Sequence, residues 1–320
     1  MSSQQLNLQG IKQLNHQTLL KWPGNKTQLL KQIGLCVSQF GNFENYYEPF
    51  LGSGALYFYL KKNKFINQKS FLNDYLNELI LFYKIIKNPK TNEKIIKEIS
   101  EIIYKYNSLE KFLDKKEMYL STRDRYNELL VKKNRTIEES IEQSALLYFL
   151  NKSCFNGVYR KSKQGKFNVP HGRRVGNSQS LNFGNQIHEN FRITQTLLRN
   201  TKLTSLSYIN VLDDVTDKDF VYLDPPYVGN FTDYTSEGFG DKDFNQLVDL
   251  INELTNKQTF FLMSNSNTPK TLDIFYDKKL YCYEIGVTRT IDRTNKSNKG
   301  STTELLISNY ELNVLGNSIW

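Results

Sequence analysis

Apolar residues follow two periods along this chain, and their order predicts a sheet wrapped by helices. Four short runs rich in β-branched and aromatic residues are typical of buried strands: 45–50, 69–74, 220–224 and 259–265. Three runs have helical spacing: 55–63, 77–88 and 244–256. Strand, turn, helix and strand in succession is the pattern of an α/β fold with a parallel sheet.

The middle of the chain has a different pattern. From about Thr91 to Leu150 the apolar spacing is helical and the intervening residues are strongly charged, and a basic, loop-like stretch follows at 152–185. Strand-like sequence returns near Leu203. We therefore predict a mostly helical insert at 89–187, which interrupts a sheet domain formed by 1–88 and 188–320.

The positive charge of the chain is unevenly distributed. Lysine and arginine number 42 against 33 acidic residues, which gives a formal net charge of +9. Between Gln143 and His188 there is no Asp or Glu, although lysines and arginines are frequent there. A basic, acid-free segment is typical of a surface that contacts phosphates, and a solvated basic loop is the alternative.

Composition argues against several other classes of protein. No apolar run approaches the ~18–20 residues that cross a bilayer, and the first residues are polar, without the apolar core of a secretory signal. The three cysteines and three histidines lack the spacing of a disulfide framework or a metal site. We predict a cytoplasmic protein without a metal and without membrane association.

A glycine turn follows the first predicted strand, in the sequence EPFLGSGA at 48–55. Gly52 and Gly54 permit a tight turn and a close approach of the backbone to a ligand. Asp74 ends the next strand about twenty residues later, where an acid in doubly wound folds accepts hydrogen bonds from ribose hydroxyls. The turn alone is also compatible with a structural role; with Asp74 it favours a cofactor that contains a nucleoside.

The sequence VYLDPPY at 221–227 ends a buried strand with a carboxylate, two prolines and a tyrosine. Consecutive prolines cannot donate backbone hydrogen bonds and fix the direction of the chain. The Asp224 carboxylate and the Pro225 carbonyl are then two acceptors able to bind the two N–H groups of an aromatic amine, which frees its lone pair for attack. Tyr227 offers a face on which a base extracted from a duplex can stack.

Six motifs in this order resemble the Dam-like family of adenine-specific DNA methyltransferases (D12 class, alpha group). They are KWPGNK (21–26), EPFLGSGALYF (48–58), LNDYLNELI (72–80), LNKSCFNGVYRKSKQGKFNVPHGR (150–173), VYLDPPY (221–227) and LMSNS (262–266). The resemblance extends from about Leu20 to Tyr310. It implies a Rossmann-like, seven-stranded methyltransferase fold with an inserted, mostly helical target-recognition domain that carries a β-hairpin.

The resemblance also implies the reaction and its participants. The cofactor is S-adenosyl-L-methionine, and the substrate is the exocyclic amino group of an adenine flipped out of a short site in double-stranded DNA. The expected context is a restriction-modification system, in which a cognate endonuclease acts on the same site without a stable complex. The enzyme is expected to be a monomer, and GATC is the first expectation for the site.

Residues are assigned by matching these motifs. The cofactor contacts are expected at Lys21, Trp22, Lys26, Glu48, Phe50, Gly52, Gly54, Asp74 and Asp224. The catalytic tetrapeptide is Asp224, Pro225, Pro226 and Tyr227. The chain departs from the family at Asn25, where a second glycine is usual, and at Gln164, where some GATC-modifying members are expected to have arginine. The target sequence therefore stays open.

The sequence VYRKSKQGKFNVPHGRR at 158–174 predicts a hairpin with Gly165 near its tip. Lysines suit phosphates, whereas Arg, Asn and Gln have the geometry to read base edges. The expected DNA contacts are Arg160, Lys161, Lys163, Gln164, Lys166, Asn168, Pro170 as an apolar wedge, and Arg173. Arg174, a later basic run at 289–299 and the aromatic residues Phe231, Tyr234 and Phe239 are further candidates.

Two other functions are compatible with parts of this pattern. An amino-methyltransferase that acts on cytosine or RNA often has Ser or Asn at the first catalytic position, so Asp224 favours adenine. A DNA-binding protein that has lost catalysis is disfavoured by the intact Asp-Pro-Pro-Tyr sequence and by Asp74.

Overall fold

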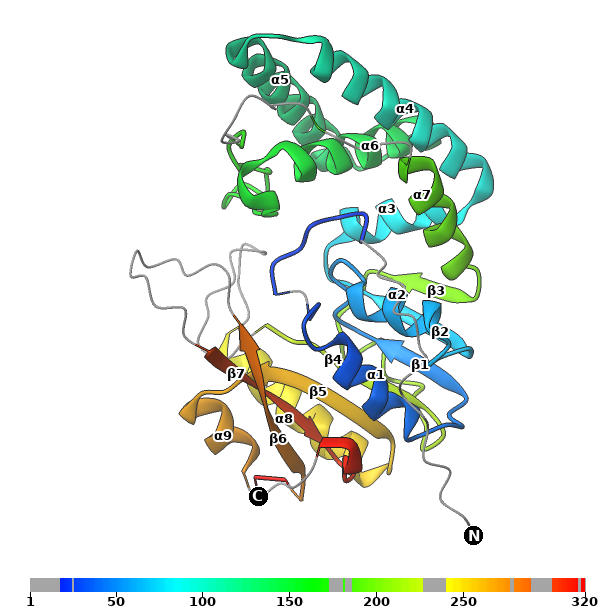
Figure 1. The fold of residues 1–320 in the computed structure, drawn as a ribbon, viewed down its shortest axis with the longest axis vertical. Coiled ribbons are helices and arrows are strands. Elements are labelled where there is room, and N and C mark those ends of the chain that lie inside the picture. The colour runs from blue at the N-terminus through cyan, green and yellow to red at the C-terminus, as the bar shows by residue number, and fades with distance from the viewer. Residues whose placement is uncertain are drawn as a thin grey trace.

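The parallel core of the predicted sheet is present, and two further strands complete it. The computed structural model describes residues 18–24, 26–172, 181, 186–226, 240–276, 279–288, 301–315 and 318–319. Within these residues the strands are β1 (Asn45–Glu48), β2 (Lys69–Asn73), β3 (Thr201–Thr204), β4 (Phe220–Leu223), β5 (Phe260–Ser266), β6 (Tyr281–Thr288) and β7 (Ser301–Ser308). They form one sheet in the order β3-β2-β1-β4-β5-β7-β6 (Figure 1).

The first five strands in this order are parallel, and β7 is antiparallel to both β5 and β6. The order reverses between β1 and β4, which places the carboxyl ends of these two strands side by side. Ligands of doubly wound sheets bind at such a reversal. The predicted Rossmann-like, seven-stranded α/β fold is confirmed, although β6 and β7 were absent from the predicted pattern.

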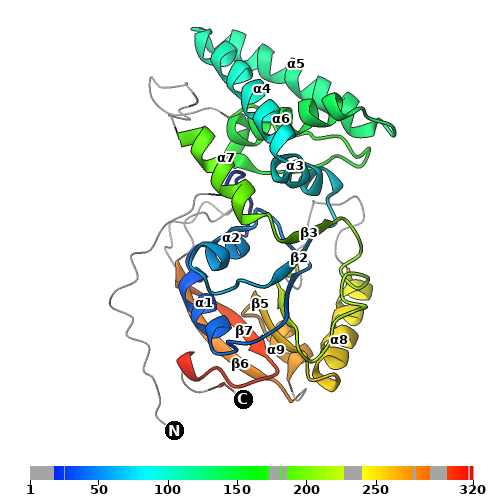
Figure 2. The same ribbon diagram turned by 90° about the vertical axis from the view of Figure 1, so that its right-hand side faces the viewer.

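Helices cover both faces of the sheet. Helices α1 (Leu30–Ser38), α2 (Ala55–Lys62) and α3 (Asn77–Lys87) pack on one face, and α8 (Asp241–Asn256) and α9 (Pro269–Phe275) pack on the other (Figure 2). Side chains alternate between the two resulting cores, as the two-residue period of a strand requires. Tyr222 faces the α1 side, for example, whereas Val221 and Leu223 face the α8 side.

The predicted helical segment forms a block above the sheet in Figure 1. Its helices are α4 (Pro89–Ser108), α5 (Phe112–Val131) and α6 (Ile137–Ser153), and α7 (Gln186–Leu197) leads back to β3. Capping residues define its helix starts: the Asn88 side chain accepts from the Lys90 backbone N–H, and Thr136 and Glu139 form a reciprocal capping box. The short 3₁₀ helices η1 (Phe155–Gly157) and η2 (Asn313–Leu315) complete the described elements.

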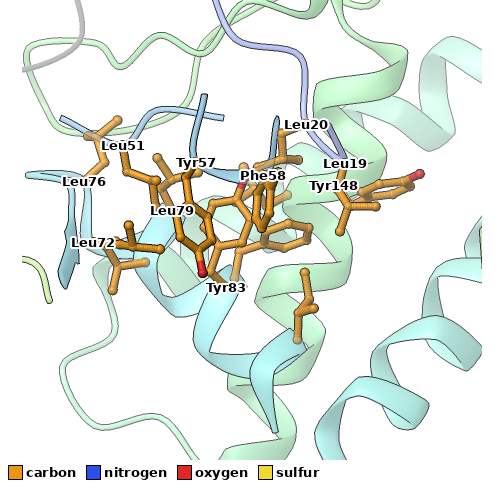
Figure 3. Close-up of a cluster of buried hydrophobic side chains, with 14 of the residues drawn as sticks. Leu19, Leu20, Leu51, Tyr57, Phe58, Leu72, Leu76, Leu79, Tyr83 and Tyr148 are labelled. Atoms are coloured by element: carbon orange, nitrogen blue, oxygen red, sulfur yellow. The ribbon is translucent and has the colours of Figure 1, made fainter. Parts of the chain in front are cut away.

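One continuous apolar core joins this block to the sheet domain. Tyr57, Phe58 and Tyr83 lie at its centre, and Tyr148 of α6 joins them beside Leu19 (Figure 3). All five side chains are at most 4% exposed. Because this core is shared, the helical block is held against the strands that carry the predicted site. The domain boundaries at 89 and 187 stay a prediction.

In the part of the chain that the structure describes, no helix is both long and apolar enough to span a membrane.

Candidate active site

The glycine turn and Asp74 meet at the carboxyl ends of β1 and β2. Gly52 and Gly54 both have left-handed backbone angles, with φ of 51° and 68°, which glycine adopts without strain. The Gly52 N–H donates to Asp74 Oδ2 at 2.9 Å, and the Leu76 N–H donates to Asp74 Oδ1 at 3.0 Å. The two predicted cofactor elements are therefore linked directly to each other.

Burial dominates the titration of Asp74. It raises the pKa of this carboxyl to about 6, although the N–H groups of Leu76 and Gly52 lower it and the Glu78 charge raises it further. At neutral pH the group is therefore mostly an anion, although its protonated form is closer in energy than for an ordinary carboxyl. Such an acid accepts hydrogen bonds from ligand hydroxyls strongly.

Two exposed apolar side chains that were not predicted as site residues flank Asp74. Tyr75 is 69% exposed and follows Asp74, and Leu206 is 46% exposed and follows the neighbouring strand β3. The Asn73 side chain holds these strand ends together by donating to the carbonyls of Pro49 and Leu206. Their exposure at the carboxyl edge of the sheet, where ligands bind, indicates a role in ligand binding.

Trp22 lies against the glycine turn. A Cβ atom placed on Gly52 would lie 2.9 Å from Trp22 Cδ1, so only glycine permits this approach. The Trp22 ring also stacks on Tyr159, with ring centroids 5.6 Å apart. Lys21 lies farther out, where its backbone N–H donates to the Asn151 side chain and its own side chain covers Gly157.

Asp224 stands at the end of β4 with two donors on one of its oxygens. Lys26 Nζ lies 2.8 Å from Asp224 Oδ1, and the Ser264 hydroxyl donates to the same atom at 3.0 Å. Tyr222 OH is hydrogen-bonded to Ser264 Oγ at 2.9 Å. Because both donors engage Oδ1, neither occupies the second oxygen, and the carboxylate is held in one orientation.

Strand alternation explains why these groups meet. Tyr222 and Asp224 are two residues apart on one face of β4, and Ser264 lies on the same face of β5, where its register partner in β7 is Leu306. Glu304, two residues before Leu306, reaches the same corner, and its Oε2 lies 3.9 Å from Lys26 Nζ. Glu304 was not predicted from the sequence; its only local signal is that it is the one charged residue of the β7 sequence STTELLIS.

Glu48 is the third acid of this corner. It is 2% exposed, and Tyr46 OH donates to its Oε2 at 2.7 Å. Burial raises the pKa of Glu48 to about 8, the Tyr46 hydrogen bond opposes this, and the charge of Asp224 adds to it. At neutral pH Glu48 is therefore mostly protonated and uncharged.

Other predicted residues at this edge are also accounted for. Phe50 packs in the core of the α8 side, with its ring centroid 5.1 Å from that of Tyr208. Pro225 is buried and Pro226 is half-buried. The structure thus brings the glycine turn, Asp74 and Asp224 to one edge of the sheet, whereas the contacts of Lys21 are with Asn151 and Gly157.

The predicted hairpin is present at residues 158–168. Lys161 and Phe167 form an antiparallel bridge, and the turn between them contains Gly165 with φ of 74°. Its second arm is bound to α5, because the Asn127 amide exchanges two hydrogen bonds with the Phe167 backbone and Tyr119 OH donates to the Val169 carbonyl.

The predicted DNA-contacting residues of the hairpin fall into two groups. Arg160 Nε donates to Asn168 Oδ1 at 2.8 Å, and the Lys161 ammonium pairs with Glu78. The side chains around the tip and after the second arm are exposed: Lys163, Gln164, Lys166 and Pro170. Glu78 and Tyr159, which anchor the first arm, were not selected from the sequence.

Several predicted residues lie outside the described part of the chain. They are Asn25, Tyr227, Arg173, Arg174, Phe231, Tyr234, Phe239 and the run 289–299. Among the residues that the structure does describe, no cluster of three His, Cys, Asp or Glu side chains is arranged to hold a metal ion.

Comparison with known proteins assigns this arrangement to a family. Residues 22–291 match the D12 class N6 adenine-specific DNA methyltransferases. The chain is 34% identical over 303 residues to the type II methyltransferase M.MjaIII of Methanocaldococcus jannaschii, with 91% of this chain and 98% of the relative covered. It is 32% identical to the type II methyltransferase M1.LlaDCHI of Lactococcus lactis subsp. cremoris, over 95% of this chain and 99% of the relative. The DNA adenine methylase of Vibrio cholerae is 26% identical over 90% of this chain and 94% of its own length. The chain therefore belongs to the D12 class of N6 adenine-specific DNA methyltransferases.

Proposed function

We propose that this enzyme transfers a methyl group from S-adenosyl-L-methionine to the exocyclic amine of an adenine flipped out of a short duplex DNA site. The observation that carries this assignment is the Asp224 carboxylate, oriented by Lys26 and Ser264 beside the turn at Gly52 and its partner Asp74. An acceptor for an amine and a site for an adenosine-containing cofactor thus share one edge of the sheet.

The residues at this edge fit the cofactor. Asp74 provides acceptors for ribose hydroxyls, and the exposed side chains of Tyr75 and Leu206 provide apolar faces for a purine ring. The left-handed turn at Gly52 and Gly54 allows the backbone to approach the ligand. When bound, the cofactor supplies an electrophilic methyl group on a sulfonium, so no nucleophilic serine or cysteine is required of the protein.

Asp224 and the Pro225 carbonyl act on the adenine amine. The lone pair of this nitrogen is delocalised into the ring, and two acceptors aimed at its N–H groups favour the pyramidal form that can attack. Lys26 and Ser264 fix the carboxylate beforehand, so little reorganisation is needed in the transition state. Tyr227 stacks on the extruded base, and the amine proton leaves to Asp224 or to solvent.

The helical block and its hairpin are assigned to DNA. We assign 89–187 as the target-recognition domain, and 1–88 with 188–320 as the catalytic domain. The exposed lysines Lys163 and Lys166 suit phosphates, and Gln164 between them suits a base edge. Within the hairpin, the Arg160–Asn168 pair offers a second set of groups for reading bases.

The relatives named type II methyltransferases support a role in a restriction-modification system. In that setting a cognate endonuclease cleaves the unmodified site without forming a stable complex with this monomeric enzyme. GATC is the first sequence to test, and Gln164 is the residue expected to alter it.

The experiment is methyl transfer from labelled S-adenosyl-L-methionine to duplex DNA, followed by digestion to nucleosides. Label in N6-methyladenine is expected, and Asp224→Ala is expected to keep cofactor binding while losing turnover. Label in methylcytosine would overturn the adenine assignment. DNA binding without any label would indicate a binding protein that lacks catalysis. Sequencing of modified bases in DNA from expressing cells then identifies the site.

A further inference from the structure

A buried glutamate joins the hairpin to the cofactor edge. Glu78 lies in the first turn of α3 and is 7% exposed. It accepts a hydrogen bond from Tyr159 OH and pairs with the Lys161 ammonium, both on the first arm of the hairpin. One carboxylate thus binds two side chains that extend from the same strand-like segment.

A series of contacts connects the first arm of the hairpin to the predicted cofactor site and back to α3. Tyr159 stacks on Trp22, whose ring touches Gly52, and the Gly52 N–H donates to Asp74. Asp74 in turn accepts from the Leu76 N–H immediately before α3, the helix that carries Glu78. The position of the first arm is therefore tied to the same groups that are proposed to hold the cofactor.

Lys161 is less exposed than the other lysines of the hairpin. The Lys161 side chain is only 19% exposed, whereas Lys163 and Lys166 are exposed. Lys161 also compensates a buried charge, and removal of one member of a buried pair leaves the other unpaired in the interior. Its geometry is that of an internal contact.

Electrostatics connect the same groups. The Glu78 charge raises the pKa of Asp74, after burial has already done so. Lys161 is the cation paired with Glu78, so a shift of the first arm changes the field at Asp74. Both contacts and charge therefore link the hairpin to Asp74.

We propose that Glu78 is a positioning residue that fixes the hairpin to the cofactor edge, so that cofactor and DNA bind cooperatively, and that Lys161 serves this contact instead of a DNA phosphate. This inference rests on the proposed DNA-binding role of the hairpin. Because coupling between two sites is reciprocal, DNA also tightens the binding of cofactor by the same factor.

The first test is the salt dependence of DNA binding. Each phosphate contact contributes about 0.9 to the slope of log affinity against log salt concentration. Lys163→Met is expected to reduce the slope by about that amount, and Lys161→Met is expected to leave it unchanged. A Glu78→Gln/Lys161→Met double variant removes both charges together and guards against loss of fold, which the thermal unfolding midpoint monitors. An equal loss of slope in Lys161→Met and Lys163→Met would overturn the assignment of Lys161.

The second test is the ratio of DNA affinities with and without saturating S-adenosylhomocysteine. Couplings of this kind are typically about 5- to 150-fold. The wild-type ratio is expected to fall toward one in Glu78→Gln and in Tyr159→Phe, which retains the ring stacked on Trp22. A merely structural role would weaken both affinities and leave their ratio unchanged, and that result, or a wild-type ratio of one, would overturn the proposal.

The two tests also separate this inference from the proposed function. An unchanged salt slope in both Lys163→Met and Lys166→Met would show that the hairpin does not contact DNA. Failure of S-adenosylhomocysteine to bind the wild-type enzyme would contradict the cofactor assignment, while the slope of Lys161→Met would still decide its role.

Discussion

Lys26 Nζ and Asp224 Oδ1 lie 2.8 Å apart, and this pair joins the segment before α1 to the end of β4. Lys26 is 5% exposed and is surrounded by Asp224, Glu304 at 3.9 Å and the Gly24 carbonyl at 3.0 Å. A buried ammonium with these neighbours sets the orientation of the carboxylate that is proposed to receive the substrate amine. We therefore expect the N-terminal segment to contribute to catalysis, although it is remote in sequence from Asp224.

Replacement of Lys26 by methionine is expected to lower kcat by about 100-fold, the size of effect seen when one preorganised electrostatic group is removed. The KM for DNA should change little, because the side chain is buried and contacts Asp224. Steady-state methylation kinetics measure both constants. Lys31→Met, at an exposed position of α1, is the matched control. A kcat close to that of the control would remove Lys26 from the orientation of Asp224.

Ser264→Ala removes the second donor to Asp224. A hydrogen bond to a charged group contributes about 1.5–3 kcal/mol, so a fall in kcat of at least about tenfold is expected. Tyr222→Phe leaves the Ser264 hydroxyl in place and should have a smaller effect, because Tyr222 contacts Asp224 only through Ser264. If Tyr222→Phe lowered kcat more than Ser264→Ala, Tyr222 would not act on Asp224 through the Ser264 hydroxyl, and this series of hydrogen bonds would be contradicted.

The elements that carry the site were predictable because their signals are local. The β1, β2 and β4 strands end at acidic residues, and β5 is an apolar run that ends in Ser and Asn shortly before Pro269. Such boundaries can be recognised from sequence. The β6 and β7 strands were missed because β7 inserts between β5 and β6, an antiparallel register that no neighbouring residue specifies. Glu304 was missed with them.

Side-chain partners were harder to predict than strands. Lys161 lies in a basic segment, and that segment gives no sign of its pairing with Glu78 of α3. Glu78 and Tyr159 are 81 residues apart in sequence, so only the tertiary structure joins them. Asp224, in contrast, was identifiable because a carboxylate between a buried strand and two prolines has no structural explanation. The glycine turn became informative only together with Asp74.

Stability should depend on pH through Glu48. Its pKa is raised to about 8 in the folded protein, so between its ordinary value and about 8 the folded state binds a proton that the unfolded state has lost. The free energy of unfolding should therefore fall as pH rises through this range, by at most about 1.4 kcal/mol per pH unit.

Glu48→Gln lacks this titration and keeps an acceptor for Tyr46 OH. Urea unfolding of both proteins between pH 5 and pH 8 measures the effect. The stability of the variant relative to wild type should increase with pH, and a difference that is constant across the range would contradict the raised pKa.

Cofactor affinity should depend on pH through Asp74. The pKa of this group is raised to about 6, so the acceptor is ionised above that pH and protonated below it. The affinity for S-adenosylhomocysteine should be full above about pH 7 and should fall below pH 6, by at most about tenfold per pH unit. Calorimetric titration provides the measurement. Asp74→Asn should bind weakly with a flat profile, and the same pH dependence in this variant would assign it to another group.

Gly52→Ala combines a steric conflict with an unfavourable backbone angle. The new Cβ would lie 2.9 Å from Trp22 Cδ1, and φ is 51°. A left-handed angle at alanine alone destabilises by about 1–2 kcal/mol, and displacement of Trp22 should add to this and weaken S-adenosylhomocysteine binding. Urea unfolding and calorimetry measure the two effects.

Gly41→Ala isolates the backbone contribution to this effect, because φ at Gly41 is 37° and no atom lies within 4 Å of its added Cβ. The loss of stability should therefore be larger for Gly52→Ala than for Gly41→Ala. A Trp22→Ala background removes the ring that the new methyl group meets, so the excess should shrink in the double variant. Equal losses for the two glycines, or an excess that persists without Trp22, would mean that contact with the ring does not fix the turn. The expected result would instead establish that the Trp22 ring packs on the turn at Gly52. Because the same ring stacks on Tyr159, it then provides a physical connection between the cofactor edge and the hairpin.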